Sequence, residues 1–347
     1  MRFYTGQHNY YCGVDLHARS MYLCVLDRQG NTRLHRNLPA DPDRFLEAVQ
    51  PFAEDLVVGA ECMFTWYWLA DVCHQAAIPF VLGHALYMKA IHGGKAKNDR
   101  IDSAKIAVLL KGGAFPVAYV YPQEWRSTRD LLRRRLHLVR KRGELVAHIQ
   151  NTYHQYNIPA PSAKLRYRAN RECVADAFQD PSAQKNVATD LAVADRLDLV
   201  IRDLEAFLTR RVKVHDPDNF HRLRSIPGVG KILAMTILYE IHTIERFPRV
   251  QDFASYARLV KCAHESAGKR SGTGGAKIGN PHLRWAFGEA VLLMLRDSEE
   301  LKKRCQRLER KHGKGKSRAI LAHKLGRAVY FMLKRKRVFQ MDRFLAG

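Results

Sequence analysis

The sequence lacks the features that mark membrane, secreted and zinc-binding proteins. No stretch approaches the ~20 apolar residues of a transmembrane helix, and residues 1–9 are too polar for a signal peptide. The seven cysteines include no Cys-x-x-Cys pair, which indicates reduced thiols. Sixteen histidines are present, but none has a second His or Cys at a convincing zinc-ligand spacing. We therefore expect a cytoplasmic protein with no membrane partner and no structural zinc.

Acidic residues are scarce relative to basic ones. The chain of 347 residues carries 34 Asp and Glu against 58 Lys and Arg, which gives a net charge of +24. An excess of this size indicates a nucleic-acid partner, although composition alone does not distinguish DNA from RNA. The apolar share of 46% is ordinary for a globular protein and argues against disorder. The clusters of basic residues include 133–135, 140–142, 311–318 and 334–337, in expected helices and one glycine-containing loop.

The first 121 residues have the pattern of an α/β domain. Apolar, β-branched and aromatic runs separated by turn residues predict strands at residues 10–15, 20–26, 32–38, 56–60 and 79–82. Helices are expected from Asp41-Pro42 to about residue 52, over residues 65–77, and from near Asn98. Three meandering strands followed by alternating helices and strands predict a mixed sheet that closes near Phe115.

The rest of the chain is predicted to be mainly helical. Residues 122–156 contain apolar side chains seven apart, and residues 187–214 repeat them every three or four positions. This region, 122–215, is expected to form long coiled-coil helices, paired either within one chain or between chains. Residues 216–347 form a third, mostly helical unit with a glycine-rich polar interruption at 267–280.

Four acidic residues occupy positions suited to a metal site. Asp15 lies within the first strand, Glu61 ends another, and Asp99 and Asp102 open a helix three residues apart, on one face. A carboxylate in a core strand is unfavourable without a partner. Carboxylates from strand, strand end and helix start make an oxygen cage that suits Mg²⁺, and two such ions would clamp a phosphodiester.

Each acid also has a purely structural interpretation. Asp15 could accept a hydrogen bond from a turn, and Glu61 could face solvent. Asp99 could cap the helix, and Asp102 could pair with Arg100 or Lys105. For one acid alone the structural interpretation is favoured, whereas the set of four in this order favours a metal site.

Two segments of the last region have the composition of nucleic-acid contacts. Residues 226–231 place Pro227, Gly228, Gly230 and Lys231 just before an apolar helix, where backbone N–H groups form a seat for phosphate. This predicts a helix-hairpin-helix element, and its alternative is a tight turn between helices. Arg284 and the terminal basic helix are further candidate phosphate contacts.

The segment 264–273 is rich in glycine, basic residues and hydroxyls. A serine hydroxyl can attack a phosphodiester if its proton is removed and the charge on phosphate is neutralised. His264, Lys269 and Arg270 are candidates for those helping roles, and Lys269 and Arg270 are also candidate nucleic-acid contacts. Taken alone, a serine in such a segment is more often a surface hydroxyl.

In combination these motifs resemble the DEDD transposases of the bridge-RNA-guided insertion-sequence family. The resemblance rests on Gly13-Val14-Asp15, Glu61 after an apolar strand, the box 97–103, and Ile226-Pro227-Gly228-Val229-Gly230. It implies a RuvC-like (RNase H-like) domain, a coiled-coil insertion and a C-terminal transposase domain, with Asp15, Glu61, Asp99 and Asp102 as the metal-binding acids. It also implies a serine nucleophile that matches Ser266, although Ala267 precedes Gly268 here, so Ser271 and Thr273 remain rivals.

The function implied by this resemblance is strand exchange between donor and target DNA, directed by a structured guide RNA and performed by a homo-oligomer, a dimer or tetramer. Two other functions fit the residues. One is an endonuclease of the Holliday-junction type, which would use the acids and water without a covalent intermediate. The other is a nucleic-acid-binding scaffold whose acids are structural.

Overall fold

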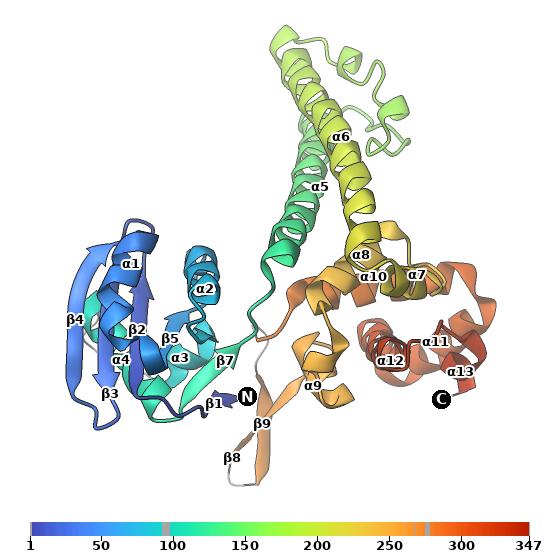
Figure 1. Cartoon of the computed structure of the whole chain (residues 1–347). Coiled ribbons are helices and arrows are strands. Elements are labelled where there is room, and N and C mark those ends of the chain that lie inside the picture. The colour runs from blue at the N-terminus through green and yellow to red at the C-terminus, as the bar shows by residue number, and fades with distance from the viewer. Residues whose placement is uncertain (1, 92–97, 267, 275–277, 347) are drawn as a thin grey trace. The chain divides into compact units, whose positions relative to one another are not determined.

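The computed structural model describes residues 2–91, 98–266, 268–274 and 278–346. The chain divides into two compact units, Met1–Gln123 and Glu124–Gly347 (Figure 1). Among the described residues, no helix combines the length and apolar character that crossing a membrane requires. The division of the second unit at residue 215 that the sequence suggests stays a prediction.

A seven-stranded mixed sheet forms the centre of the first unit, in the order β1-β7-β6-β5-β2-β3-β4. β2, β3 and β4 form the predicted antiparallel meander, whereas β5 pairs parallel with both β2 and β6. The mixed α/β sheet is confirmed, with two short strands, β1 and β7, that were not predicted. The strands are β1 Phe3–Tyr4, β2 Tyr10–Leu16, β3 Ser20–Asp27, β4 Thr32–Pro39, β5 Leu56–Glu61, β6 Phe80–Gly83 and β7 Phe115–Ala118.

Helices cover both faces of this sheet. α1 (Pro42–Val49) and α2 (Trp66–Gln75) pack on the face that carries Cys12, Val14 and Leu16. α4 (Asp99–Lys111) packs on the face that carries Tyr11 and Val57, close to the short α3 (Ala85–Ile91). Because side chains alternate along a strand, Asp15 shares the α4 face with Tyr11 and Gly13.

Two long helices open the second unit, α5 (Gln123–Gln155) and α6 (Pro181–His215). Ion pairs join Arg135 to Glu205, Arg142 to Asp198 and His148 to Asp190. As the residue number rises along α5, the partner's number falls along α6, so the two helices are antiparallel neighbours within one chain (Figure 1). The two helical patterns thus pair within this chain, and pairing between chains stays a prediction.

The remaining helices share one hydrophobic core. α8 is buried from Leu233 to Ile241 and packs against α7 and α10, and α10 in turn packs against the long α12. The sequence did not predict the antiparallel hairpin of β8 and β9 within the glycine-rich region. The elements are α7 Pro217–Arg224, α8 Lys231–Ile241, α9 Val250–Tyr256, β8 Cys262–Ser266, β9 Lys269–Gly274, α10 Pro281–Asp297, α11 Glu299–His312, α12 Lys314–Lys334 and α13 Met341–Ala346.

Candidate active site

Gly13 lets α4 approach β2 at backbone distance. A Cβ atom at residue 13 would lie 2.2 Å from the Ser103 carbonyl oxygen and 2.4 Å from the Ala107 amide nitrogen. Any side chain there would push the helix away from the strand, because real Cβ atoms do not approach backbone atoms so closely. The contact therefore holds the first turn of α4, with its two acids, beside the end of β2.

Asp15 and Asp99 meet at this junction, with His17 between them. The Nε2 atom of His17 lies 3.5 Å from Asp15 Oδ2 and 3.4 Å from Asp99 Oδ1. The Asp15 side chain is 18% exposed, whereas that of Asp99 is 54% exposed. The cluster thus runs from the half-buried strand end to the open surface, where a large substrate can reach it.

The surroundings of Asp15 contain too little positive charge to balance its carboxylate. Burial is the largest cause and raises the pKa of Asp15, and the carboxylates of Asp99 and Asp102 raise it further. His17 acts in the opposite direction through its charge and a hydrogen bond. A bound cation would favour the ionised form of all three acids.

Glu61 occupies the matching position on the neighbouring strand. β2 and β5 are parallel with Val14 opposite Ala60, so Asp15 and Glu61 follow each other in register at the carboxyl ends of their strands. Alternation gives Glu61 the α4 face, since Gly59 contacts Leu110 of that helix. The half-buried Glu61 side chain therefore belongs to the same edge of the sheet as Asp15.

Asp102 is the second acid in the first turn of α4. Asn98 caps this helix by accepting a hydrogen bond from the Ile101 N–H at 2.8 Å, so Asp99 is the first helical residue and not the cap. Asp102 Oδ1 lies 3.3 Å from Lys105 Nζ, the ion pair that its structural interpretation anticipates. The pair does not remove Asp102 from the cluster, because its charge still raises the pKa of Asp15.

The donor atoms present fit a divalent cation. Among the described residues, ligand atoms of Asp15, His17 and Asp99 all lie within 4.8 Å of one another. Carboxylate oxygens are the ligands that Mg²⁺ and Mn²⁺ prefer, and imidazole nitrogen is accepted by Mn²⁺ and other transition metals. The sequence interpretation missed His17. The signal was its spacing, because Asp15 and His17 are two residues apart at the end of a strand.

Comparison with known proteins identifies the chain. A transposase family model of the DEDD type, DEDD_Tnp_IS110, matches residues 12–158, and a second, described as "Transposase IS116/IS110/IS902 family", matches residues 220–306. The chain belongs to the IS110 family of transposases. The DEDD model spans all four acids of the cluster, and a domain of this kind uses divalent metal. The protein is accordingly a DNA-recombining enzyme.

Two curated relatives agree with this assignment. The transposase is 23% identical over 335 residues to the transposase for insertion sequence element IS1111A of Coxiella burnetii, which covers 94% of this chain and 90% of the relative. It is 28% identical over 207 residues to the putative transposase y4pF/y4sB of Sinorhizobium fredii. This alignment covers 56% of this chain and 52% of that protein.

The serine segment of the transposase lies in the β8–β9 hairpin. Ser266 is the last residue of β8 and pairs in register with Lys269, which is exposed. The side chains of Ser266, Arg270, Ser271 and Thr273 lie outside the described residues, as does that of His264. The hairpin begins shortly after α9 and ends shortly before α10, so the backbone at both of its ends is tied to the helical core.

The predicted phosphate-binding segment, residues 226–231, has two parts with different surroundings. Gly228 has φ +78°, and a Cβ atom there would lie 2.8 Å from the amide nitrogen of Met294 in α10. Gly228 thus serves a tight turn against a helix, as its structural interpretation proposed. Gly230 and Lys231 are exposed at the start of α8, with nothing within 4 Å of a Cβ at Gly230. Arg284 of α10 is also exposed.

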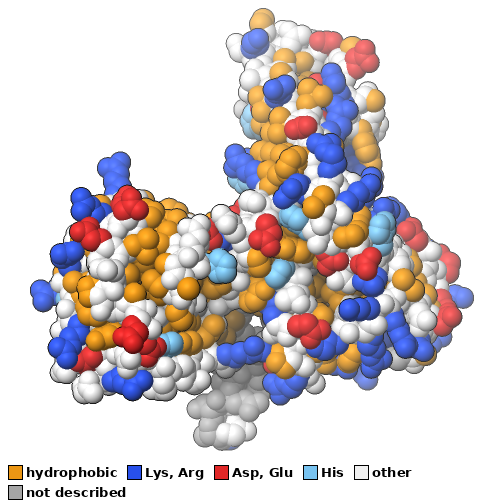
Figure 2. Space-filling view, in the orientation of Figure 1, with side chains coloured by type: hydrophobic (Ala, Val, Ile, Leu, Met, Phe, Trp, Pro, Cys, Tyr) orange, Lys and Arg blue, Asp and Glu red, His pale blue; other side chains and the backbone are white. Residues whose placement is uncertain are grey.

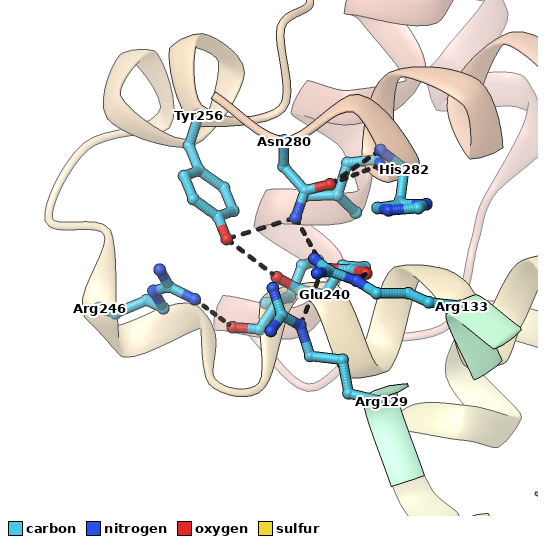
Figure 3. A network of polar contacts seen from close by, with 9 residues as sticks. Arg129, Arg133, Glu240, Arg246, Tyr256, Asn280 and His282 are labelled. Carbon is cyan, nitrogen blue, oxygen red and sulfur yellow. Dashed lines mark hydrogen bonds and ion pairs between the residues drawn. The ribbon is translucent and has the colours of Figure 1, made fainter. Parts of the chain in front are cut away.

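A buried polar network, absent from the sequence interpretation, joins α5 to the serine-bearing region (Figure 3). The Glu240 side chain of α8 is 2% exposed and accepts hydrogen bonds from Arg129 Nε at 3.0 Å and from Arg133 Nε at 2.6 Å. Asn280 Nδ2 donates to Glu240 at 2.7 Å, while Asn280 Oδ1 caps α10. The Glu240 carboxylate therefore joins the first turns of α5 to Asn280, the residue that caps α10. Asn280 follows the end of β9 by six residues.

Proposed function

We propose that Asp15, Glu61, Asp99 and Asp102 hold two Mg²⁺ ions at which the transposase cleaves DNA strands. The observation that carries this is the convergence of Asp15 and Asp99 on one point, with Glu61 in register beside Asp15. Ions bound there would neutralise the charge that develops on the scissile phosphate. The carboxylates orient the ions, and Lys105 holds Asp102 in place.

We propose further that Ser266 is the nucleophile. Its Oγ atom would form a bond to phosphorus while the bond from phosphorus to one strand oxygen breaks. The serine proton is lost to a base, and the departing oxygen takes up a proton to become a hydroxyl. The phosphoserine ester conserves the free energy of the broken phosphodiester bond. A hydroxyl of another strand can therefore attack phosphorus, displace the serine and rejoin the DNA. Exposed Lys269, opposite Ser266 in the hairpin, supports phosphate binding at this position.

A covalent adduct tests the serine assignment. With a nicked DNA substrate that traps the intermediate, wild-type protein should form a protein–DNA band on a denaturing gel, and Ser266→Ala should form none. Ser271→Ala and Thr273→Ala, from the same hairpin, are the matched controls and should keep the band. Loss of the band in Ser271→Ala or Thr273→Ala alone would move the assignment to that residue. Cleavage without any adduct would favour hydrolysis by water, as in a junction endonuclease.

Membership of a transposase family makes DNA the substrate. The resemblance to RNA-guided members implies a guide RNA as a second nucleic-acid partner. In the space-filling view, Lys and Arg side chains are spread over the second unit, among apolar and acidic ones, on α5 and α6 as well as on the C-terminal helices (Figure 2). Such surfaces bind backbone phosphates without reading sequence. A structured RNA that pairs with donor and target DNA would then supply sequence specificity while the protein recognises shape and charge. The helix-hairpin-helix role of residues 226–231 belongs to the same proposal.

The paired helices support a homo-oligomer. α6 carries apolar side chains at residues 193, 207 and 214, which share one seven-residue register and which its pairing with α5 leaves exposed. Val193 is 46% exposed, Phe207 is 42% exposed and Val214 is 73% exposed. A seven-residue apolar repeat is the pattern of a coiled-coil seam. A second copy of the chain would bury this stripe.

A further inference from the structure

The C-terminal end of the chain encloses a small pocket that the catalytic scheme does not use. It lies between the last turns of α12, residues 335–340 and α13, and its volume is about 220 Å³. This is below the ~300–1,000 Å³ of typical small-molecule sites, so it suits a group of the size of one planar ring system. Its lining combines cations with aromatic rings: Lys324, Arg335, Arg343, Phe331, Phe339 and Phe344. None of the described residues that line it is acidic.

Two contacts from outside the pocket hold its walls in place. The Phe339 N–H donates a hydrogen bond to Ser225 Oγ at 2.9 Å, which ties residues 335–340 to the end of α7. Arg304 of α11 donates to the Leu345 carbonyl and so anchors α13. The pocket is therefore formed by the fold itself and not by a loose chain end.

Lys324 is a buried cation in the lining of the pocket. Its Nζ atom is buried and has no hydrogen-bond partner among the described residues. Burial and the charge of Arg304 lower the pKa of Lys324. The ammonium lies 5.1 Å from the centroid of the Phe344 ring, a cation–π contact. A buried cation without a hydrogen-bond acceptor is costly, and an anionic oxygen from a ligand would remove that cost.

The aromatic residues give the pocket a stacking surface. Phe331 is 36% exposed, and the Arg335 guanidinium lies over its ring, 5.0 Å from the centroid. Phe339 and Phe344 also line the pocket, and their ring centroids lie 5.5 Å apart. Nucleobases stack on aromatic rings and on guanidinium planes, whereas phosphate alone needs neither surface.

We propose that this pocket binds one unpaired nucleotide of a DNA or RNA strand, with its phosphate at Lys324 and its base against Phe331. A duplex keeps its bases stacked on one another, so the pocket distinguishes single-stranded from double-stranded nucleic acid. This proposal takes from the proposed function only that the partner is a nucleic acid. Its test measures binding and not cleavage, so the two can fail separately.

The test compares a blunt hairpin duplex with the same hairpin carrying a single-stranded overhang, once as DNA and once as RNA. Binding to the full-length protein is followed by fluorescence anisotropy at one fixed salt concentration. Phe331→Ala and Lys324→Met should weaken overhang binding on the order of tenfold and blunt-duplex binding far less. The overhang type that shows the larger loss identifies the natural strand.

Two controls separate the pocket from general charge and from misfolding. Lys316→Met removes one exposed lysine from the same helix, outside the pocket, and should weaken both ligands by the same small factor. Phe331→Trp keeps a stacking ring and should restore overhang binding, which a misfolded protein would not do. Equal losses for blunt and overhang ligands in Phe331→Ala and Lys324→Met, or no loss, would overturn the proposal.

Discussion

Asp15→Asn is expected to lower strand cleavage by at least about 10³-fold while DNA binding stays within about twofold. The substitution keeps the shape of the side chain but removes the charge at the point where β2 and α4 meet. His17 and Asp99 would remain, with one carboxylate fewer to hold a cation. Binding should persist, because the basic residues proposed to bind DNA belong to the second unit and are unchanged. Cleavage on labelled DNA and a binding titration with the same substrate measure the two effects.

Asp43→Asn is the matched control for this experiment. Asp43 is an exposed carboxylate in the first turn of α1, as Asp99 is in the first turn of α4, but it lies on the opposite face of the sheet from the cluster. Its loss should leave cleavage unchanged. Wild-type cleavage by Asp15→Asn would show that the acids have a structural role, and the scaffold interpretation would replace the enzymatic one.

Glu240→Gln is expected to lower the free energy of unfolding of the second unit by about 3–5 kcal/mol. The glutamine cannot balance the charges of Arg129 and Arg133, which would then face a buried neutral amide. Denaturant unfolding followed by circular dichroism measures the loss. Glu245→Gln is the control, because the Glu245 pair with Lys334 is exposed and should contribute little to stability. If the two variants unfold alike, Glu240 does not hold the network together.

The same residue predicts a pH dependence of stability. Burial acts to raise the pKa of Glu240, but hydrogen bonds from Arg133 and Asn280 and the charges of both arginines lower it to about 2. The folded value thus lies below the unfolded one, near 4.3. The stabilisation is fully present above that pH and is lost as the pH falls from about 4.3 towards 2. In Glu240→Gln this part of the acid dependence should disappear.

Local patterns predicted most elements of the first unit, except β1, β7 and α3, because each of them is set by neighbours in the sequence. Apolar and aromatic runs bounded by turn residues predicted β2 and β3. Asp41 followed by Pro42 predicted the start of α1, where Asp41 Oδ1 accepts from two backbone N–H groups. Asp15 stood out because a carboxylate in a core strand needs a partner. The positions of all four acids are as the sequence suggested, but their role as ligands stays a prediction.

The rest depends on contacts between distant residues. In the sequence Glu240 is a single charged residue in an apolar helix. Its partners Arg129 and Arg133 are more than 100 positions away. In the sequence those arginines are ordinary basic residues of a long helix, and their role becomes visible only when they contact Glu240. The β8–β9 hairpin was missed because glycine-rich, polar residues have low strand propensity. Lys324 resembles any basic residue of a solvated helix until α13 closes over it.

The measurement that tests the central claim most directly is anomalous X-ray diffraction from crystals of the protein soaked in Mn²⁺. The account predicts anomalous density between the carboxylates of Asp15 and Asp99, within coordination distance of both, and none in crystals of Asp15→Asn. Density elsewhere, or a fully occupied site that survives in Asp15→Asn, would contradict it.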